Sequence, residues 1–265
     1  FEDARMVLFA GINGAGKTSV LDAVATLMSW FVLRLRTNTG SGTLPRDTDI
    51  TNNENDCTIS LRVEHGGQSY SWTIARTRKG RTKTASSDYE DVSKLAALIQ
   101  TGLSNAPDSA NVPLFVYYPV NRAVLDIPIR IRTRHEFTQL SAYEKTGTDF
   151  RTFFEWFRDQ EDYENEKNRF VAPLFTDPFC EDKNLAAVRK AVYGFLPSFS
   201  DLKIQRRPLK MVVRKTNISD SYITLNSAHS VLEINQLSDG EKNLLALVGD
   251  LARRFALTNP GLENP

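Results

Sequence analysis

Hydrophobic residues change their spacing from segment to segment, and each spacing predicts a type of element. The apolar run at 5–10 ends at a glycine and predicts a short buried strand. Apolar residues then recur at helical spacing across 19–35, which predicts a helix behind a glycine-rich loop. The positions expected on its buried face are Val20, Leu21, Val24, Leu27, Met28 and Phe31. The chain therefore begins as strand, loop and helix.

The following segment has the pattern of a β-hairpin. Runs at 57–63 and 68–76 are rich in strand-forming residues and are joined through Glu-His-Gly-Gly. A helix is predicted at 89–103, and the apolar run at 112–120 predicts another strand.

A long helix is predicted at 149–170. Its phenylalanines follow the spacing i, i+3, i+4, i+7 and share one face: Phe150, Phe153, Phe154 and Phe157. An aromatic face at this spacing is normally buried, so we expect core packing rather than a docking surface. The acidic stretch Glu161–Glu166 is expected to be exposed and could face a partner.

The last third contains a predicted helix at 182–195 and strand-like runs at 202–205, 210–213, 222–225 and 231–234. A final helix should end before Pro260, and its apolar face is Leu244, Leu247, Val248, Leu251 and Phe255. Strands thus lie near both ends, and a helical stretch at about 148–196 separates them. This order predicts one α/β core with a helical insertion.

Composition narrows the class of protein only slightly. Lys and Arg total 33 against 32 Asp and Glu, so the net charge of +1 excludes a chain-wide polycation but not a local basic patch. Cys57 and Cys180 have no metal-ligand spacing and fit free thiols in a reducing cytoplasm, although one disulfide would also be possible. No run of 18 apolar residues occurs, so we expect no membrane-spanning helix.

The glycine-rich loop carries the clearest chemistry. Residues 11–18, Gly-Ile-Asn-Gly-Ala-Gly-Lys-Thr, match the phosphate-binding pattern G-x-x-x-x-G-K-[ST] in full, between a predicted strand and a predicted helix. Glycines allow the backbone N–H groups to turn toward an anion, and the following helix adds the positive end of its dipole. Lys17 can reach the β- and γ-phosphates, and the Thr18 hydroxyl can ligate Mg²⁺. The expected phosphate-binding residues are Asn13, Gly14, Ala15, Gly16, Lys17, Thr18 and Ser19.

Two motifs together carry a resemblance to a known superfamily. Asn-Gly-Ala-Gly-Lys-Thr-Ser-Val-Leu-Asp-Ala-Val resembles the P-loop and first helix of ABC-type ATPases of the SMC, RecF and OLD kind. Leu-Ser-Asp-Gly-Glu-Lys-Asn, at 237–243, resembles their LSGGE signature. The resemblance implies an α/β P-loop NTPase of the ABC head type whose heads pair head to tail. The residues that would then contact ATP across the interface are Ser238, Asp239, Gly240 and Glu241.

The middle of the chain carries a narrower resemblance. Leu-Phe-Val-Tyr-Tyr-Pro-Val-Asn-Arg-Ala-Val-Leu-Asp-Ile-Pro and the helix at 149–170 resemble PtuA-like ATPases of Septu and retron defence systems. The resemblance implies an ATPase with slow, regulatory turnover that oligomerises and partners an HNH nuclease of the PtuB type in anti-phage defence. In retron versions a reverse transcriptase and its RNA–DNA product join the assembly.

Departures from the ABC pattern limit what can be carried over. The strand ending in Asp-Glu (Walker B) and the switch histidine are not found in the sequence, so the catalytic base is unknown. We therefore expect a longer protein in which 1–147 and 199–265 are the two parts of an incomplete head and 148–198 is the helical insertion. Asn121, Arg122 or Gln139 could supply the polar group that senses Mg²⁺ and the attacking water, although a capping or salt-bridging role is the simpler interpretation.

Basic residues form two local groups. Arg76, Arg78, Lys79, Arg81 and Lys83 form a basic loop, and Arg130, Arg132 and Arg134 alternate along a strand-like run. Either group could bind a nucleic-acid backbone, but a solvated charged face is the commoner outcome.

Two other functional classes remain open. One is a DNA-repair or chromosome-maintenance ATPase that clamps DNA directly. The other is a transporter-coupling ATPase, which is less favoured because 219 residues, from 19 to 237, separate Thr18 from Ser238.

The signature segment has a second, local interpretation. Ser238 and Glu241 form the S-x-x-E pattern of a capping box at a helix start, and a capped helix N-terminus is also an anion site. Asp239 stands where the signature has glycine, and its charge near a γ-phosphate would be unfavourable. We therefore expect Asp239 to point away from the nucleotide, toward a cationic group at the interface between heads.

Overall fold

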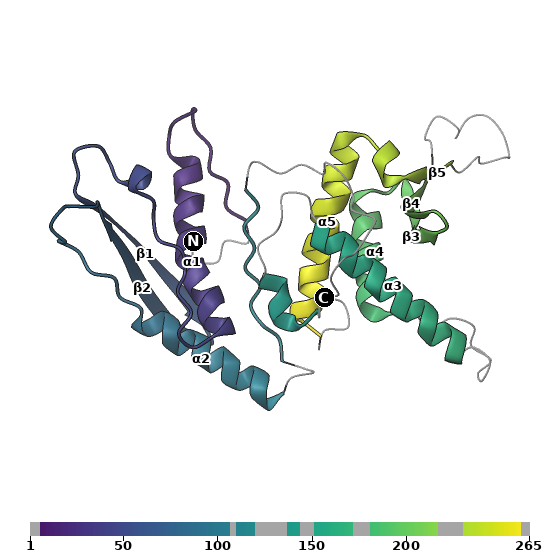
Figure 1. The fold of residues 1–265 in the computed structure, drawn as a ribbon, viewed down its shortest axis with the longest axis horizontal. Helices are drawn as coiled ribbons and strands as arrows, with labels where there is room; N and C mark the ends of the chain where they lie inside the picture. Colours follow the sequence, from purple (N-terminus) through teal and green to yellow (C-terminus); the bar gives the residue numbers. More distant parts are fainter. Residues whose placement is uncertain are drawn as a thin grey trace. The chain divides into compact units, whose positions relative to one another are not determined.

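The computed structural model describes residues 6–106, 110–119, 137–143, 151–171, 181–216 and 230–260, and the side chains of 170 and 171 lie outside this description. The chain divides into two compact units, Phe1–Pro107 (unit 1) and Asp108–Pro265 (unit 2), shown in Figure 1. Each unit has its own helices, its own antiparallel sheet and its own buried residues.

Unit 1 consists of a β-hairpin and two long helices. In chain order its elements are α1 (Lys17–Arg36), the short 3₁₀ helix η1 (Asp47–Asp49), β1 (Asp56–His65), β2 (Gln68–Thr77) and α2 (Glu90–Asn105).

The hairpin confirms the prediction from the alternating pattern. Its strands pair in register from Asp56–Thr77 to His65–Gln68. Gly66 and Gly67 form the two-residue turn with φ of 59° and 75°, a combination that favours glycine because it has no Cβ.

The core of unit 1 lies where the helices meet β2. Trp72 is 1% exposed, and its Nε1 donates to the Leu27 carbonyl at 3.1 Å, which joins β2 to α1. The buried apolar residues are Leu27, Trp30, Phe31, Leu35, Ile50, Tyr70, Trp72, Ile74, Val92, Leu95, Ala96 and Ile99. By length and composition alone α1 could cross a membrane, but buried core helices meet the same criterion, and the second half of α1 packs in this way.

The predicted buried face of α1 is only partly correct. Leu27 and Phe31 are buried as expected, but Val20 and Leu21 are exposed, and Trp30 and Leu35 are buried instead. The core contacts therefore lie along the second half of the helix, whereas its first half follows the glycine-rich loop.

Two predicted strands are not strands in the structure. Residues 6–10 and 112–119 have no strand assignment. A strand requires a paired neighbour, and the second segment instead runs along the last helix. There Val112 N–H donates to the Thr258 carbonyl at 3.0 Å, and the Tyr118 hydroxyl donates to Asp250 at 2.9 Å.

In its described residues, unit 2 combines three long helices with a three-stranded antiparallel sheet. The helices are α3 (Arg151–Val171), α4 (Lys183–Phe195) and α5 (Asp239–Thr258), with short 3₁₀ helices η2 (Gln139–Tyr143) and η4 (Ile234–Gln236). The sheet has the order β3 (Phe199–Arg206), β4 (Leu209–Lys215), β5 (Ser230–Glu233). These elements match the predicted helices and three of the four predicted strand runs; the run at 222–225 lies outside the described residues.

The aromatic face of α3 is buried, as its spacing predicts. Phe153, Phe154 and Phe157 are at most 4% exposed and belong to a core shared with α4, α5 and the sheet, whereas Phe150 lies outside the described residues. Gly249 of α5 meets this face, because a Cβ added there would lie 2.3 Å from the tip of the Phe153 ring.

The acidic part of α3 corrects a prediction. Glu161 and Glu164 are buried at 5% and 2% exposure, whereas Asp162 is exposed. Glu164 pairs with Arg189 of α4 at 3.1 Å, and Glu161 pairs with Arg206 of β3 at 3.0 Å. Burial raises the pKa of Glu161, although hydrogen bonding from the Ile204 N–H and the charge of Arg206 oppose the shift. Glu161 and Glu164 therefore join α3 to β3 and α4, whereas Asp162 and Glu166 are exposed as predicted.

The buried face of α5 also differs from the prediction. Phe255 is exposed, and the buried side includes Asp250, Arg253 and Arg254. Asp250 pairs with both arginines at 2.8 Å. Burial would raise the pKa of Asp250, but the two arginines outweigh it and the pKa is lowered. Helical spacing identifies apolar positions only and could not reveal that Asp250 forms ion pairs with both arginines in the interior.

The compact units do not follow the boundaries expected at 147/148 and 198/199. Helices α3 and α4 share one hydrophobic core with β3, β4 and α5. Whether 148–198 is an insertion into an ATPase head remains a prediction.

Candidate nucleotide-binding segments

The glycine-rich loop has a tight backbone conformation that depends on two glycines. Gly14 and Gly16 have φ of 86° and 82°, in the left-handed region, and Gly16 caps α1. The first helical hydrogen bond is donated by Val20 N–H to Gly16 O at 3.1 Å. The N–H groups of Lys17, Thr18 and Ser19 therefore have no acceptor within the helix, and no acidic side chain stands in this first turn. Such a helix start suits an anion.

Lys17 is held by its own loop. Its ammonium donates to the carbonyls of Gly11 and Ile12 at 2.8 Å and 2.7 Å. Ala15 N–H donates to the same Ile12 carbonyl at 3.3 Å, so this predicted phosphate donor is engaged within the loop. Thr18 and Ser19 are exposed, and a hydroxyl at the start of the helix suits Mg²⁺ next to a bound phosphate.

The signature segment forms the start of α5 with a complete capping box. Ser238 is the N-cap, and its Oγ accepts from Glu241 N–H at 3.4 Å. Glu241 Oε2 accepts from Ser238 N–H at 3.2 Å and from the Ser238 hydroxyl at 2.9 Å. Gly240 is exposed, and a Cβ there would meet no atom within 4 Å. The capping-box interpretation of this segment is confirmed. The helix start is exposed at Gly240.

Two lysines compensate the acids of this segment. Asp239 is 91% exposed and pairs with Lys242 of its own helix at 2.8 Å, which lowers the pKa of Asp239. The cationic partner of Asp239 is therefore a lysine of its own helix, whereas the prediction placed such a group at the interface. Lys215, the last residue of β4, pairs with Glu241 at 2.7 Å, and this hydrogen bond lowers the pKa of Glu241.

The remaining candidates are less informative. Gln139 in η2 donates its side-chain amide to the Ala110 carbonyl at 2.8 Å, which fits an anchoring role and leaves the proposed water-sensing role untested. Asn121, Arg122 and the alternating arginines Arg130, Arg132 and Arg134 lie outside the described residues.

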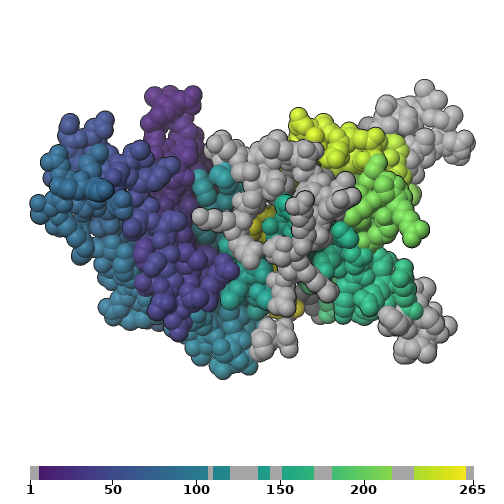
Figure 2. All heavy atoms as spheres, viewed as in Figure 1, coloured from purple at the N-terminus to yellow at the C-terminus, as the bar shows by residue number. Residues whose placement is uncertain are grey.

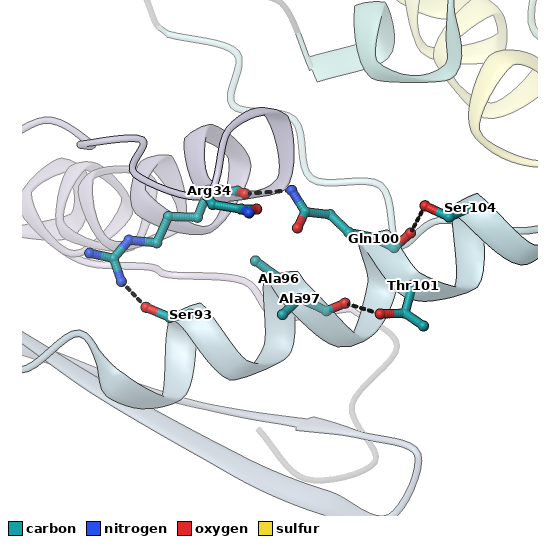
Figure 3. Close-up of a pocket in the computed structure, with 8 residues that line it drawn as sticks. Arg34, Ser93, Ala96, Ala97, Gln100, Thr101 and Ser104 are labelled. Atoms are coloured by element: carbon teal, nitrogen blue, oxygen red, sulfur yellow. Dashed lines mark hydrogen bonds between the residues drawn. The ribbon is translucent and has the colours of Figure 1, made fainter.

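A pocket between α1 and α2 does not belong to the phosphate loop. It has a volume of about 550 Å³ and is lined by Arg34, Asn38, Ser93, Ala96, Ala97, Gln100, Thr101 and Ser104 (Figure 3). Arg34 lies 17 residues after Lys17 on the same helix, roughly 25 Å away at 1.5 Å per residue. Figure 3 also shows its polar groups bonded within the pocket: Arg34 donates to Ser93, and Gln100 donates to the Arg34 carbonyl. These contacts join the two helices.

The AAA domain family matches residues 1–172, which is more than half of the chain. The chain belongs to this family. The matched region contains the phosphate loop and α1, in agreement with an α/β P-loop ATPase.

Two curated relatives are similar along nearly the whole chain. The Retron Ec83 probable ATPase of Escherichia coli is 29% identical over 97% of this chain and 56% of its own length. The Retron Vc95 probable ATPase of Vibrio cholerae serotype O1 biovar El Tor is 24% identical over 99% of this chain and 58% of its own length. These relatives confirm the resemblance to retron ATPases, and the chain spans rather more than half of their length.

Sequence reasoning missed both lysines that neutralise the signature acids. The i, i+3 spacing of Asp239 and Lys242 could have indicated their pair, because residues three apart are neighbours on a helix. No local signal could have indicated Lys215, which lies 26 residues before Glu241 and reaches it only because the fold brings the two side chains together.

Proposed function

We propose that this AAA domain protein is the nucleotide-binding part of an ABC-type ATPase. The observation that carries the proposal is the glycine-rich loop ending at Gly16. It is followed by a helix start whose first N–H groups have no acceptor within the helix, and Lys17, the first residue of that helix, reaches back to the loop. In this proposal Asn13–Ser19 surround the phosphates of ATP, and Lys17 contacts the β- and γ-phosphates. Thr18 ligates Mg²⁺, which also binds phosphate oxygens.

The signature segment would complete the site of a second protomer. Ser238, Asp239, Gly240 and Glu241 would approach the γ-phosphate held at Lys17 of that protomer in a head-to-tail dimer. The Ser238 hydroxyl now donates to Glu241, so it would rotate to donate to phosphate instead. The open surface at Gly240 and the capped helix start support this role.

The relatives support a proposal for the cellular role. We place the protein in the cytoplasm, as the ATPase of an anti-phage defence assembly with slow, regulatory turnover. Its partners would be a PtuB-like HNH nuclease and a reverse transcriptase with its RNA–DNA product. The retron ATPases that resemble this chain support this part of the proposal. Co-purification of a nuclease or reverse transcriptase with the full-length protein tests it, and recovery of a membrane permease instead would contradict it.

The variant Lys17→Ala tests the phosphate site in the full-length protein. Loss of a charge-assisted hydrogen bond is worth about 1.5–3 kcal/mol, so we expect ATP affinity to fall about 10- to 100-fold. Fluorescence titration with a labelled ATP analogue measures the change. Lys94→Ala is the matched control, because Lys94 forms only exposed pairs with Glu90 and Asp91 on α2. Unchanged affinity in Lys17→Ala would refute the assignment of the loop.

A further inference from the structure

The loop between β2 and α2 contains a turn rich in positive charge. We call residues 78–84 the cationic turn; it contains Arg78, Lys79, Arg81 and Lys83. Arg81 N–H donates to the Arg78 carbonyl at 3.1 Å, and Gly80 has φ of 81°. The chain therefore reverses at a glycine that tolerates the left-handed region. Figure 1 shows this loop leaving the end of β2 and returning to α2.

Both ends of the cationic turn are attached to the neighbouring loop. Arg78 N–H donates to the Asn55 carbonyl at 2.8 Å. The Arg78 guanidinium donates to the carbonyls of Ile50, Thr51 and Glu54 at 3.3–3.4 Å. At the other end the Thr84 hydroxyl donates to Asp56. These contacts fix the base of the turn, so less conformational entropy remains to be lost when the turn binds a partner.

The cations beyond this base project into solvent. Arg76, just before the turn, forms an ion pair with Asp47 at 3.2 Å, and the Arg78 guanidinium donates hydrogen bonds to backbone carbonyls. Lys79, Arg81 and Lys83 are exposed, and no ion pair is found for them within the described part of the chain. No acidic residue occurs from Arg76 to Ser87. Figure 2 shows the surface of unit 1 that contains the hairpin and the residues around 80.

Residues close to Lys79, Arg81 and Lys83 add uncharged hydrogen-bond donors to the cationic turn. Thr82 and Ser86 are exposed; Thr82 lies between Arg81 and Lys83, and Ser86 follows Lys83 by three residues. Phosphate oxygens accept from Lys, Arg, Ser and Thr side chains in protein–nucleic acid contacts. The segment 79–86 contains no aromatic residue on which a base could stack, so the chemistry fits the backbone and not base recognition.

We propose that the cationic turn binds the phosphodiester backbone of a nucleic acid, without sequence specificity, through Lys79, Arg81 and Lys83. The assignment is separate from the nucleotide site, because it uses none of the phosphate-loop or signature residues. If the three cations were only hydrated, the turn would not bind nucleic acid. The two alternatives differ in how strongly the affinity for nucleic acid depends on salt when the turn is mutated.

The test compares the full-length wild type with the triple variant Lys79→Gln/Arg81→Gln/Lys83→Gln. The probe is a fluorescein-labelled single-stranded DNA of mixed sequence, and anisotropy is measured from low to moderate salt. Each lost phosphate contact should reduce the slope of log K against log salt by about 0.7, or roughly 2 for all three. The affinity at 0.1 M salt should fall by about 10- to 100-fold.

A matched variant separates local binding from bulk charge. Arg36→Gln/Lys183→Gln/Arg207→Gln removes the same charge from exposed positions elsewhere and should change the affinity less than about twofold. ATP-analogue binding should be unchanged in both triple variants, which shows that they fold. Equal losses in the two variants, or wild-type affinity and slope in the first, would overturn the proposal. So would tighter binding of a polyglutamate peptide than of DNA, which would identify an acidic protein as the partner.

Discussion

Two acidic residues at the start of α5 each form an ion pair with a lysine. Lys242 holds Asp239, and Lys215 holds Glu241, so the carboxylates remain ionised but their charge is offset within about 3 Å. Without the lysines, two negative charges would face any phosphate that approaches this helix start. Asp239 differs from the glycine of related signatures, and Lys242 compensates for it within the same turn.

We predict that Lys215→Gln weakens ATP-dependent self-association of the full-length protein by several-fold. The variant leaves the charge of Glu241 uncompensated next to the incoming phosphate, a repulsion of about 1 kcal/mol in a solvated setting. Sedimentation velocity with and without ATP measures the change. ATP-analogue binding measured at protein concentrations too low for self-association should not change, because Lys215 is not one of the proposed phosphate-loop residues.

Lys210→Gln provides the comparison for Lys215→Gln. Lys210 lies on the same strand and pairs with Glu233, which is not part of the signature. The double variant Lys215→Gln/Glu241→Gln should recover part of the self-association, because both charges are then absent. Equal effects of the two single variants would show that loss of any β4 lysine is enough.

Helices were predicted from spacing more successfully than the faces that they bury. The long helices at α1, α3 and α5 were expected from periodicity, and each is present. In α5 the buried face includes Asp250 and Arg254, which neutralise each other in the interior. In α3 the buried acids depend on arginines of α4 and β3, far away in sequence. Periodicity shows which positions of a helix are polar or apolar. It cannot show that a charged residue will be buried next to an ion-pair partner that is distant in sequence.

The contact between α3 and α5 depends on the absence of a side chain. We predict that Gly249→Ala destabilises the protein by about 1–3 kcal/mol, the usual effect of overpacking a core. Alanine favours a helix by about 1 kcal/mol over glycine, but the Phe153 ring at 2.3 Å from the new Cβ reverses this gain. Urea unfolding followed by circular dichroism measures the change in the free energy of unfolding.

Gly194→Ala is the control for this steric effect. Gly194 lies in α4 of the same unit, and a Cβ there would meet no atom within 4 Å. We expect Gly194→Ala to be neutral or to stabilise by up to about 1 kcal/mol. If Gly249→Ala also stabilises, the close packing of Phe153 against α5 is incorrect.

At the scale of the whole molecule, the two motifs that we propose to bind nucleotide belong to different compact units. The phosphate loop lies in unit 1 and the signature segment in unit 2. Both motifs were recognisable from the sequence because each is local: glycines define one and a capping box defines the other. The strands expected at 5–10 and 112–120 were predicted wrongly, since 6–10 and 112–119 have no strand assignment. Strand formation depends on a neighbouring strand that the local pattern does not specify.

A head-to-tail dimer predicts that two inactive variants complement each other. Lys17→Ala damages the phosphate loop and Ser238→Arg blocks the signature, so each homodimer should lack ATPase activity. In an equimolar mixture half of the dimers are mixed, and one of their two sites is intact, so about a quarter of the wild-type activity should return. Phosphate release by the full-length proteins measures it.

Failure of the mixture to regain activity would show that both motifs serve the same protomer or that the signature has no role. Adding a third variant with both substitutions provides the control. When mixed with either single variant, it should yield no activity, because no pairing then creates an intact site.

The internal contacts of Lys17 have a consequence for the heat of nucleotide binding. Its ammonium already holds the carbonyls of Gly11 and Ile12, so ATP would exchange one set of acceptors for another. Calorimetry would record the difference between these two sets and not the full enthalpy of the lysine–phosphate contacts. A modest binding enthalpy would therefore be compatible with a strong contribution of Lys17 to affinity.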